Sequence, residues 1–275
     1  MILRNKLTAL TIFVLLFVTS FSFSQTTTSN IVLGQSIAID SKILNETREI
    51  FIYTPEGYNQ SNDNYAVIYV LDGESKFFIA TAINNFLATN GRMPRTIVVG
   101  IPNVARNRDL TPNIGEQPIN TGGVDNFIKF LEEEVMAFVN KAYRTHDFNI
   151  LFGHSYGGMF SVYTLFTNPD LFDAHIAASP SLMFGDEFVV QKVEEILANE
   201  SKFNNQIYMS IGDEPNYYAS LDKLTALLTK NDSGLTWTLE KYADEDHGSI
   251  PFRTIADGLE FVYADWQLPN ETAMK

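Results

Sequence analysis

Cysteine is absent from the 275-residue sequence. No disulfide can stabilise the fold, so stability has to come from a buried core, and thiolate zinc sites and a lipoprotein anchor are excluded. Basic residues are also few, with 19 Lys and Arg against 33 Asp and Glu and a net charge of −14. Because this balance repels phosphate backbones and anionic lipid, we expect no nucleic acid partner and no stable membrane anchor.

Internal repeats, long charged runs and proline-rich linkers are missing from the sequence as well. The composition that remains is 45% hydrophobic and 13% aromatic, which is typical of chains that bury a sizeable core. We therefore predict a single domain over residues 25–275.

The first 24 residues follow a different pattern. Two positive charges in "MILRNK" precede a short apolar run, and small residues in "SFS" precede Gln25. This pattern predicts a signal peptide over residues 1–24, with export to the periplasm or the medium after cleavage. An uncleaved anchor is the alternative, but the run is short and contains Thr and Ser. Cleavage removes Arg4 and Lys6 and takes the net charge from −14 to about −16.

Hydrophobic periodicity predicts an α/β fold. The alternation in "REIFIYTP" indicates a half-exposed antiparallel strand, whereas "YAVIYVLDG" and "RTIVVGIPN" are nearly continuous apolar runs with a helical pattern between them. Strands and helices then alternate to the end, which indicates a mostly parallel sheet with antiparallel N-terminal strands and helices on both faces. The remaining predicted helices are 124–143, 156–172, 187–200, 219–231 and 253–266, and the remaining strands are 148–155, 172–182, 206–214 and 235–248.

The stretch "FGHSYGG", residues 152–158, places Ser155 where a predicted strand turns into a predicted helix. Gly153 and Gly157 occupy the two positions at which we expect a side chain to block that turn. A glycine-rich turn with a capping serine is the plain alternative, but the strand before it and the helix after it favour a nucleophile elbow.

A serine nucleophile needs a base, and the sequence offers four histidines. We expect His154 to point away from the serine along the elbow, while His146 precedes the motif strand and His175 falls in a core-like strand. His247 lies in the polar loop "ADEDHGSIP" after a late strand, where its ring can reach the elbow. His247 is therefore the predicted base.

The acid of a triad should follow the strand before the one that leads to the histidine, and "YMSIGDEPN" ends such a strand. It offers both Asp213 and Glu214, and alternation cannot decide which side chain points inward once the loop begins. We favour Glu214.

An oxyanion hole needs two backbone donors. The N–H of Tyr156 is the first candidate, and the N–H of Gly73 or Glu74, in the loop after an earlier strand, is the second. Gly73 would let that loop pass close to the serine.

Motifs along nearly the whole chain after residue 24 carry a resemblance. "YVLDGESKFF", "FGHSYGGMFSVYTLFTNPDLF", "AASPSLMF", "IGDEPN" and "EDHGSIP" occur in the order found in the "Putative esterase" family of the α/β-hydrolase superfamily, which includes esterase D and trilactone siderophore esterases. The resemblance implies an α/β-hydrolase fold, Ser155 as nucleophile, His247 as base and a glutamate as acid.

"ARNRDLTP" also resembles a signature of that family, in which Arg106 or Arg108 lines the substrate cleft. A structural salt bridge to Asp109 is the alternative for these arginines. No metal and no cofactor are expected.

Three functions compete at this point. The chain is a serine hydrolase that cleaves small carboxylic esters of a siderophore, aryl or acetyl type, an acyltransferase that uses the same acyl-enzyme, or a catalytically silent binding protein on a hydrolase scaffold. The candidates for nucleophile, base, acid and oxyanion hole favour the hydrolase.

Overall fold

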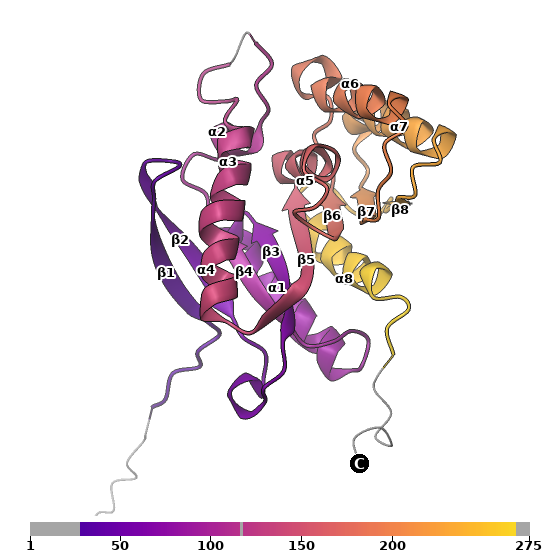
Figure 1. Ribbon diagram of the computed structural model, residues 1–275. Helices are drawn as coiled ribbons and strands as arrows, with labels where there is room; N and C mark the ends of the chain where they lie inside the picture. Colours follow the sequence, from indigo (N-terminus) through magenta and orange to yellow (C-terminus); the bar gives the residue numbers. More distant parts are fainter. Residues whose placement is uncertain (1–27, 116–117, 268–275) are drawn as a thin grey trace, which may run out of the picture. The chain divides into compact units, whose positions relative to one another are not determined.

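The computed structural model describes residues 28–115 and 118–267 (Figure 1). The chain divides into two compact units, Met1–Val32 and Leu33–Lys275. Of the first unit only residues 28–32 are described, and they form neither helix nor strand. The predicted signal peptide, residues 1–24, lies outside the described residues. The helices and strands of the described residues all belong to the second unit.

The described strands of this unit form one eight-stranded sheet in the order β1-β2-β4-β3-β5-β6-β7-β8. The strands β1 and β2 form an antiparallel pair, as do β2 and β4, and all other neighbours are parallel. The prediction of a mostly parallel sheet with antiparallel N-terminal strands is thereby confirmed. The bounds are β1 (Gln35–Ser41), β2 (Glu46–Tyr53), β3 (Tyr65–Leu71), β4 (Thr96–Ile101), β5 (Thr145–His154), β6 (Ala174–Ala178), β7 (Gln206–Ile211) and β8 (Thr236–Lys241).

The N-terminal hairpin has one buried face. In β2 the residues Arg48, Ile50 and Ile52 are buried, and residues between them are more exposed, as the alternating sequence predicts. Arg48 takes one of the inward positions because it forms an ion pair at 2.8 Å with the equally buried Asp109. Isolated burial of a guanidinium would be far more costly.

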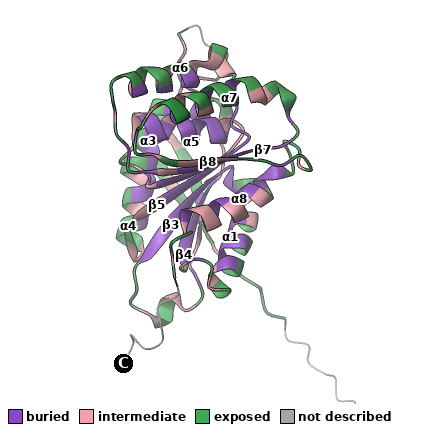
Figure 2. Ribbon diagram, turned by 90° about the vertical axis from the view of Figure 1, so that its right-hand side faces the viewer, coloured by how far each residue is buried: buried purple, intermediate pink, exposed green. Residues whose placement is uncertain are grey.

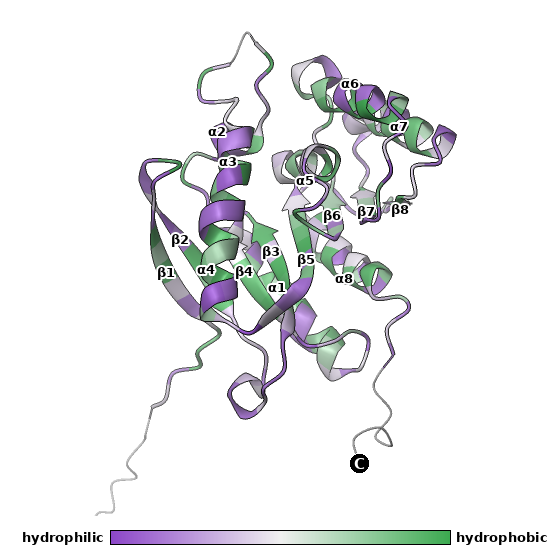
Figure 3. Cartoon of the chain, viewed as in Figure 1, coloured by the Kyte–Doolittle hydropathy of each residue, from purple (hydrophilic) through white to green (hydrophobic). Residues whose placement is uncertain are grey.

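The middle of the sheet is covered on both faces. Every residue of β3 and β4 is buried, which explains why these strands have nearly continuous apolar sequences. Figure 2 shows buried strands between helices whose outer surfaces are exposed, and Figure 3 shows the same strands as the hydrophobic part of the unit.

The helices form two layers. One face of the sheet packs against α1 (Gly73–Thr89) and α8 (Ile250–Val262), and the other packs against the remaining long helices. Successive side chains of β3 enter opposite layers, since Tyr69 packs on one side and Val70 on the other. The second layer and the short helices are η1 (Tyr58–Gln60), α2 (Arg106–Leu110), α3 (Val124–Phe130), the π-helical η2 (Leu131–Met136), α4 (Ala137–Ala142), α5 (Tyr156–Thr167), α6 (Phe184–Ala198) and α7 (Pro215–Lys230).

Three details depart from the sequence prediction. The single helix predicted over 124–143 is present, but its middle turn is π-helical. Glu187, the first residue of the helix predicted over 187–200, has left-handed backbone angles, as do Gly185 and Asp186 before it. The five-residue helix α2 was not predicted, because so short an element carries no readable period.

Within residues 28–115 and 118–267, no helix is both long enough and apolar enough to cross a membrane.

Candidate active site

The candidate nucleophile lies in a sharp strand-to-helix turn. Strand β5 ends at His154 and α5 begins at Tyr156, so Ser155 alone makes the connection, with φ 61° and ψ −117°. A left-handed φ is energetically costly for any residue other than glycine, and such backbone strain is characteristic of nucleophile elbows. A Cβ on Gly153 would lie 2.0 Å from the carbonyl oxygen of Gly157, so only glycine fits at that position. The predicted elbow geometry is confirmed.

The prediction for the second glycine was wrong. A Cβ on Gly157 would make only ordinary contacts, the nearest at 3.5 Å, whereas a Cβ on Gly158 would lie 2.8 Å from the carbonyl oxygen of Ala178. The close approach falls one residue later because α5 packs against the end of β6 and the turn that follows it. Sequence periodicity alone does not reveal that contact.

His247 and Glu214 form a hydrogen-bonded pair at the carboxyl edge of the sheet. The distance from His247 Nδ1 to Glu214 Oε2 is 2.5 Å, and the Glu214 residue is only 8% exposed. A carboxylate at Nδ1 fixes the ring and leaves Nε2 for a second partner. Asp213 is exposed. Of the two adjacent acids, Glu214 is therefore the one that contacts the histidine.

The ring of His154 contacts the His247 ring. Because His154 directly precedes Ser155, this contact places the pair of His247 and Glu214 near the elbow. The ring centroids of His154 and His247 are 4.6 Å apart, and those of Tyr217 and His247 are 5.0 Å apart. This contact between the two histidine rings was not predicted from the sequence. Burial, with the neighbouring His247 as a second cause, lowers the pKa of His154 to about 4, so its ring is neutral at neutral pH.

The other two histidines lie elsewhere. His175 is fully buried in β6, with Nδ1 3.1 Å from Ser161 Oγ, and burial lowers its pKa to about 3. His146 is exposed near the first residue of β5, whereas Ser155 follows the last residue of that strand. Neither histidine is placed to contact Ser155.

Two helix N-termini supply candidate oxyanion donors. Tyr156 begins α5, and Gly73 and Glu74 begin α1, so all three N–H groups belong to first turns that lack intrahelical acceptors. A Cβ on Gly157 would lie 3.6 Å from Asp72 Oδ2, which brings the β3–α1 turn against α5. At Gly73 itself a Cβ would lie 2.6 Å from the backbone nitrogen of Ile101, so this glycine permits a close approach to β4, not to the serine as expected.

The two arginines from the sequence signature have different surroundings. Arg106 binds both carboxylate oxygens of Asp72, with Nε to Oδ1 at 2.6 Å and Nη2 to Oδ2 at 3.0 Å, and also donates to the carbonyl oxygen of His154 at 3.1 Å. Burial alone would raise the pKa of Asp72, but Arg106 holds it below its usual value. The guanidinium therefore joins the turn before α1 to the elbow.

Arg108, in contrast, binds Glu46 at 2.6 Å and Asp109 at 2.7 Å, in the group of charges that surrounds Arg48. The alternative of a structural salt bridge to Asp109 thus holds for Arg108 and not for Arg106.

Three polar side chains near the site were missed in the sequence. Asn103 donates through Nδ2 to Asp72 at 2.6 Å and to Glu74 at 2.7 Å. Ser179 donates to Glu214 Oε1 at 2.5 Å, and Ser181 Oγ lies 3.1 Å from Ser155 Oγ. All three follow strand ends, and Ser179 and Ser181 lie in the motif "AASPSLMF", but no spacing rule assigns a partner to any of them.

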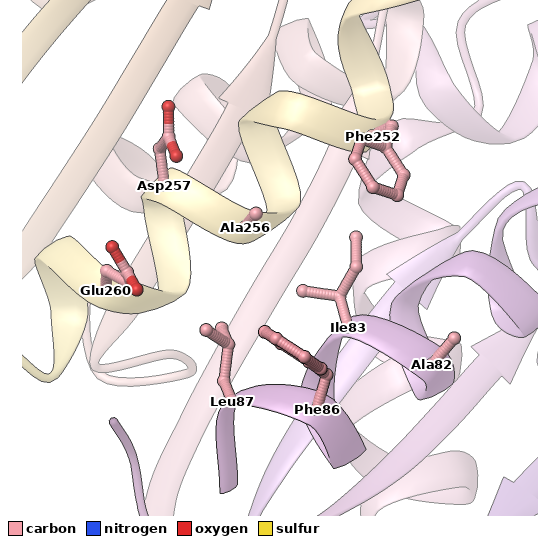
Figure 4. A pocket seen from close by; sticks show the side chains of 8 residues that line it. All are labelled: Ala82, Ile83, Phe86, Leu87, Phe252, Ala256, Asp257 and Glu260. Carbon is pink, nitrogen blue, oxygen red and sulfur yellow. The ribbon is translucent and has the colours of Figure 1, made fainter. Parts of the chain in front are cut away.

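An apolar groove lies between α1 and α8, apart from the site. Figure 4 shows apolar side chains of both helices around it, and its volume is about 440 Å³. Its two carboxylates are engaged, Asp257 by Tyr242 at 2.5 Å and Glu260 by Arg92 at 2.9 Å. The lining residues are Ala82, Ile83, Phe86, Leu87, Phe252, Ala256, Asp257 and Glu260, none of which is a candidate site residue.

The described residues contain no cluster of three or more His, Asp or Glu side chains suited to holding a metal ion.

An α/β sheet with a serine elbow and a hydrogen-bonded histidine and glutamate at the same edge defines the class of α/β-hydrolases with serine-hydrolase sites. Residues 41–247 match the model of the "Putative esterase" family. The chain belongs to that family, and its fold and its hydrolase relatives agree with the resemblance noted in the sequence.

Several relatives of known kind are similar to this chain. It is 28% identical to the ferri-bacillibactin esterase BesA of Bacillus subtilis, over 81% of this chain and 87% of that protein. It is 26% identical to the siderophore enterobactin esterase of Emericella nidulans, over 75% and 85%. Among solved structures, an IroE-like serine hydrolase from Shewanella oneidensis has a TM-score of 0.79 at 32% identity, covering 86% of this chain and 82% of that one. These relatives are esterases and serine hydrolases.

Proposed function

We propose that this protein hydrolyses carboxylic esters of the siderophore type through an acyl-enzyme on Ser155. The observation that carries the proposal is the 2.5 Å hydrogen bond between His247 Nδ1 and Glu214, formed beside a strained serine elbow. In this arrangement Ser155 is the nucleophile, His247 the general base and Glu214 the acid that holds the imidazole in the correct tautomer.

The reaction proceeds in two symmetric halves. Ser155 Oγ attacks the ester carbonyl carbon while its proton passes to His247 Nε2, and the resulting oxyanion accepts hydrogen bonds from the N–H of Tyr156 and of Gly73 or Glu74. The protonated imidazole then gives its proton to the leaving alkoxide, and the acyl group remains on Ser155. Water repeats the sequence with the same base, which releases the carboxylic acid and restores the serine.

The choice of a siderophore-type ester is supported by the relatives whose names specify such substrates. Arg106 donates to the carbonyl oxygen of His154, and its guanidinium lies 5.8 Å over the Tyr156 ring, which follows Ser155 directly. An aromatic acyl group would find a complementary surface there.

We also propose export, with cleavage before Gln25 and a final location in the periplasm or the medium. The support is the charge and hydropathy pattern of residues 1–24. N-terminal sequencing of the protein recovered from separated cell fractions tests it, and an intact Met1 in the cytoplasmic fraction would contradict it.

Covalent labelling tests the enzymatic proposal directly. A fluorophosphonate probe should label the protein once, at Ser155, and Ser155→Ala should abolish both labelling and hydrolysis of a catecholate trilactone. Loss of labelling without loss of hydrolysis, or labelling at a different serine, would rule the assignment out. Product analysis with and without an added alcohol distinguishes water from another acyl acceptor.

A further inference from the structure

The turn that follows β6 contains two buried serines. Ser179, Pro180 and Ser181, called the SPS turn below, connect β6 to the residues before α6, and the two serines are 0% and 3% exposed. Ser179 also has a left-handed backbone, with φ 41°. A buried hydroxyl requires a partner, and a left-handed φ is unfavourable for serine, so this conformation must be held by specific contacts.

At the first serine, the contact is with the acid. Ser179 Oγ donates to Glu214 Oε1 at 2.5 Å, and the Gly212 N–H donates to the same oxygen at 3.2 Å. The other oxygen, Oε2, binds His247 Nδ1. Two donors on one oxygen prevent the carboxylate from rotating and direct its second oxygen at the histidine.

At the last serine, the contact is with the nucleophile. Ser181 Oγ lies 3.1 Å from Ser155 Oγ, and the Ser181 N–H donates to the Ser155 carbonyl oxygen at 3.1 Å. The N–H of Ser155 donates in turn to the carbonyl oxygen of Ala178 at 2.9 Å. The close packing of Gly158 belongs to the same contact, since a Cβ there would lie 3.1 Å from the Cα of Pro180. The elbow is thus fixed to the SPS turn through its backbone and its reactive oxygen.

We propose that the SPS turn aligns both ends of the catalytic chain: Ser179 as a positioning residue for Glu214, and Ser181 as a catalytic residue that donates its hydroxyl hydrogen to Ser155 Oγ. With that donor in place, the Ser155 hydroxyl proton is left for His247 Nε2. The same donor stabilises the negative charge that grows on Ser155 Oγ as its proton departs. This inference rests on the proposed esterase function.

For Ser179 the test is a double-mutant cycle. Ser179→Ala should lower kcat about tenfold and leave KM unchanged, because a hydrogen bond to a charged group is lost. Ser179→Gly removes the same hydroxyl but relieves the left-handed backbone, so it should lose as much. In the Glu214→Gln background Ser179→Ala should cost less than about twofold, since its effect passes through the carboxylate. An equal loss in both backgrounds, or a wild-type rate for Ser179→Gly, would overturn the role of Ser179.

For Ser181 the test is the rate at which the fluorophosphonate reacts with Ser155. Ser181→Ala should slow this reaction and kcat together by about tenfold, with KM and the melting temperature unchanged. Ser181→Thr keeps the hydroxyl and should stay within about threefold of the wild type. The matched control is Ser161→Ala, which removes another buried hydroxyl with a 3.1 Å hydrogen bond and should leave the labelling rate unchanged.

The outcomes separate the two proposals. Absence of labelling at Ser155 in the wild-type protein contradicts the esterase function itself. Normal labelling of the wild type together with a wild-type rate for Ser181→Ala, or equal losses for Ser181→Ala and Ser181→Thr, contradicts only the role of Ser181. All rates are referred to the folded fraction by burst titration of the acyl-enzyme, so partial misfolding of a variant does not mimic the predicted loss.

Discussion

Two serines of the β5–α5 segment, Ser155 and Ser161, each have a histidine in their neighbourhood, and only the neighbourhood of Ser155 has the features of an active site. Ser161 and His175 share a direct hydrogen bond of 3.1 Å, and both are fully buried. His247, beside Ser155, has a side chain that is 37% exposed and is bonded to a carboxylate. His175 Nε2, in contrast, is buried without a hydrogen-bond partner. A short serine–histidine distance is therefore not sufficient; the imidazole also needs a counter-charge and access to solvent.

The largest expected effect follows from substituting the two histidines, His247 and His175, one at a time. His247→Ala should lower kcat by about 10⁴-fold or more, because it removes the only group that takes the Ser155 proton in the proposed mechanism. His175→Gln should leave kcat of the folded protein unchanged. Ester hydrolysis measured with both variants checks this, and the reverse order would make the buried pair the catalytic one.

The second effect concerns the counter-charge. Glu214→Gln keeps the shape of the side chain but removes the charge that stabilises the imidazolium, so kcat should fall by about 10³-fold. The matched control is Asp213→Asn, at an exposed neighbouring carboxylate, which should stay within about threefold of the wild type. If Glu214→Gln costs less than about tenfold, Ser155 and His247 act as a dyad without help from the acid.

The third effect is on stability and belongs to the buried pair. Burial lowers the pKa of His175 in the folded protein to about 3, whereas an unfolded histidine titrates near 6.5. As the pH falls below about 6.5 the unfolded state takes up a proton that the folded state does not, so the free energy of unfolding decreases, by about 3 kcal/mol between pH 6.5 and 4.

Denaturant unfolding of the wild type and of His175→Gln across this pH range checks the linkage. The stability of the variant should decline less steeply by that amount, since the contributions of all other groups are common to both proteins. Parallel pH profiles would show that the pKa of His175 is the same in the folded and unfolded states.

The smallest effect compares the two serine backbones. Ser155 has φ 61°, so Ser155→Gly should raise the free energy of unfolding by about 1 kcal/mol while abolishing activity. Ser161 lies inside α5, and Ser161→Gly should lower the free energy of unfolding by about 1 kcal/mol or more, because glycine is unfavourable inside a helix and the hydrogen bond to His175 is lost. Thermal unfolding of Ser155→Gly and Ser161→Gly gives the sign of each change in stability directly. A destabilised Ser155→Gly would mean that the elbow stores no strain.

Most of the fold could be predicted from the sequence because the apolar patterns are long and regular. The continuous apolar runs of β3 and β4 and the alternation in β2 specify buried and half-buried strands. Local features broke these patterns. The five residues of α2 are too few for a period, and the left-handed segment from Gly185 to Glu187 depends on tertiary contacts.

In the site, residue types could be predicted more readily than directions. Ser155 was predictable because the elbow is defined by neighbours in sequence. The choice between Asp213 and Glu214 was not, because the two-residue period of β7 ends at Ile211 and the loop sets each side chain independently. The side chains of His154 and Arg106 meet partners far away in sequence, and Ser179 and Ser181 lie in a turn whose contacts exist only after β5, β6 and β7 are aligned.

The position of the catalytic groups along the chain bears on how the protein is made. Strand β5 and the elbow come before Glu214 and His247 in the sequence, since these two residues follow β7 and β8, which are later than β5 in chain order. Chains fold from the N-terminus as they are synthesised, so a growing chain holds the nucleophile well before its acid and base. In the proposed mechanism such a chain is latent, and the esterase becomes active only once β8 has joined the sheet.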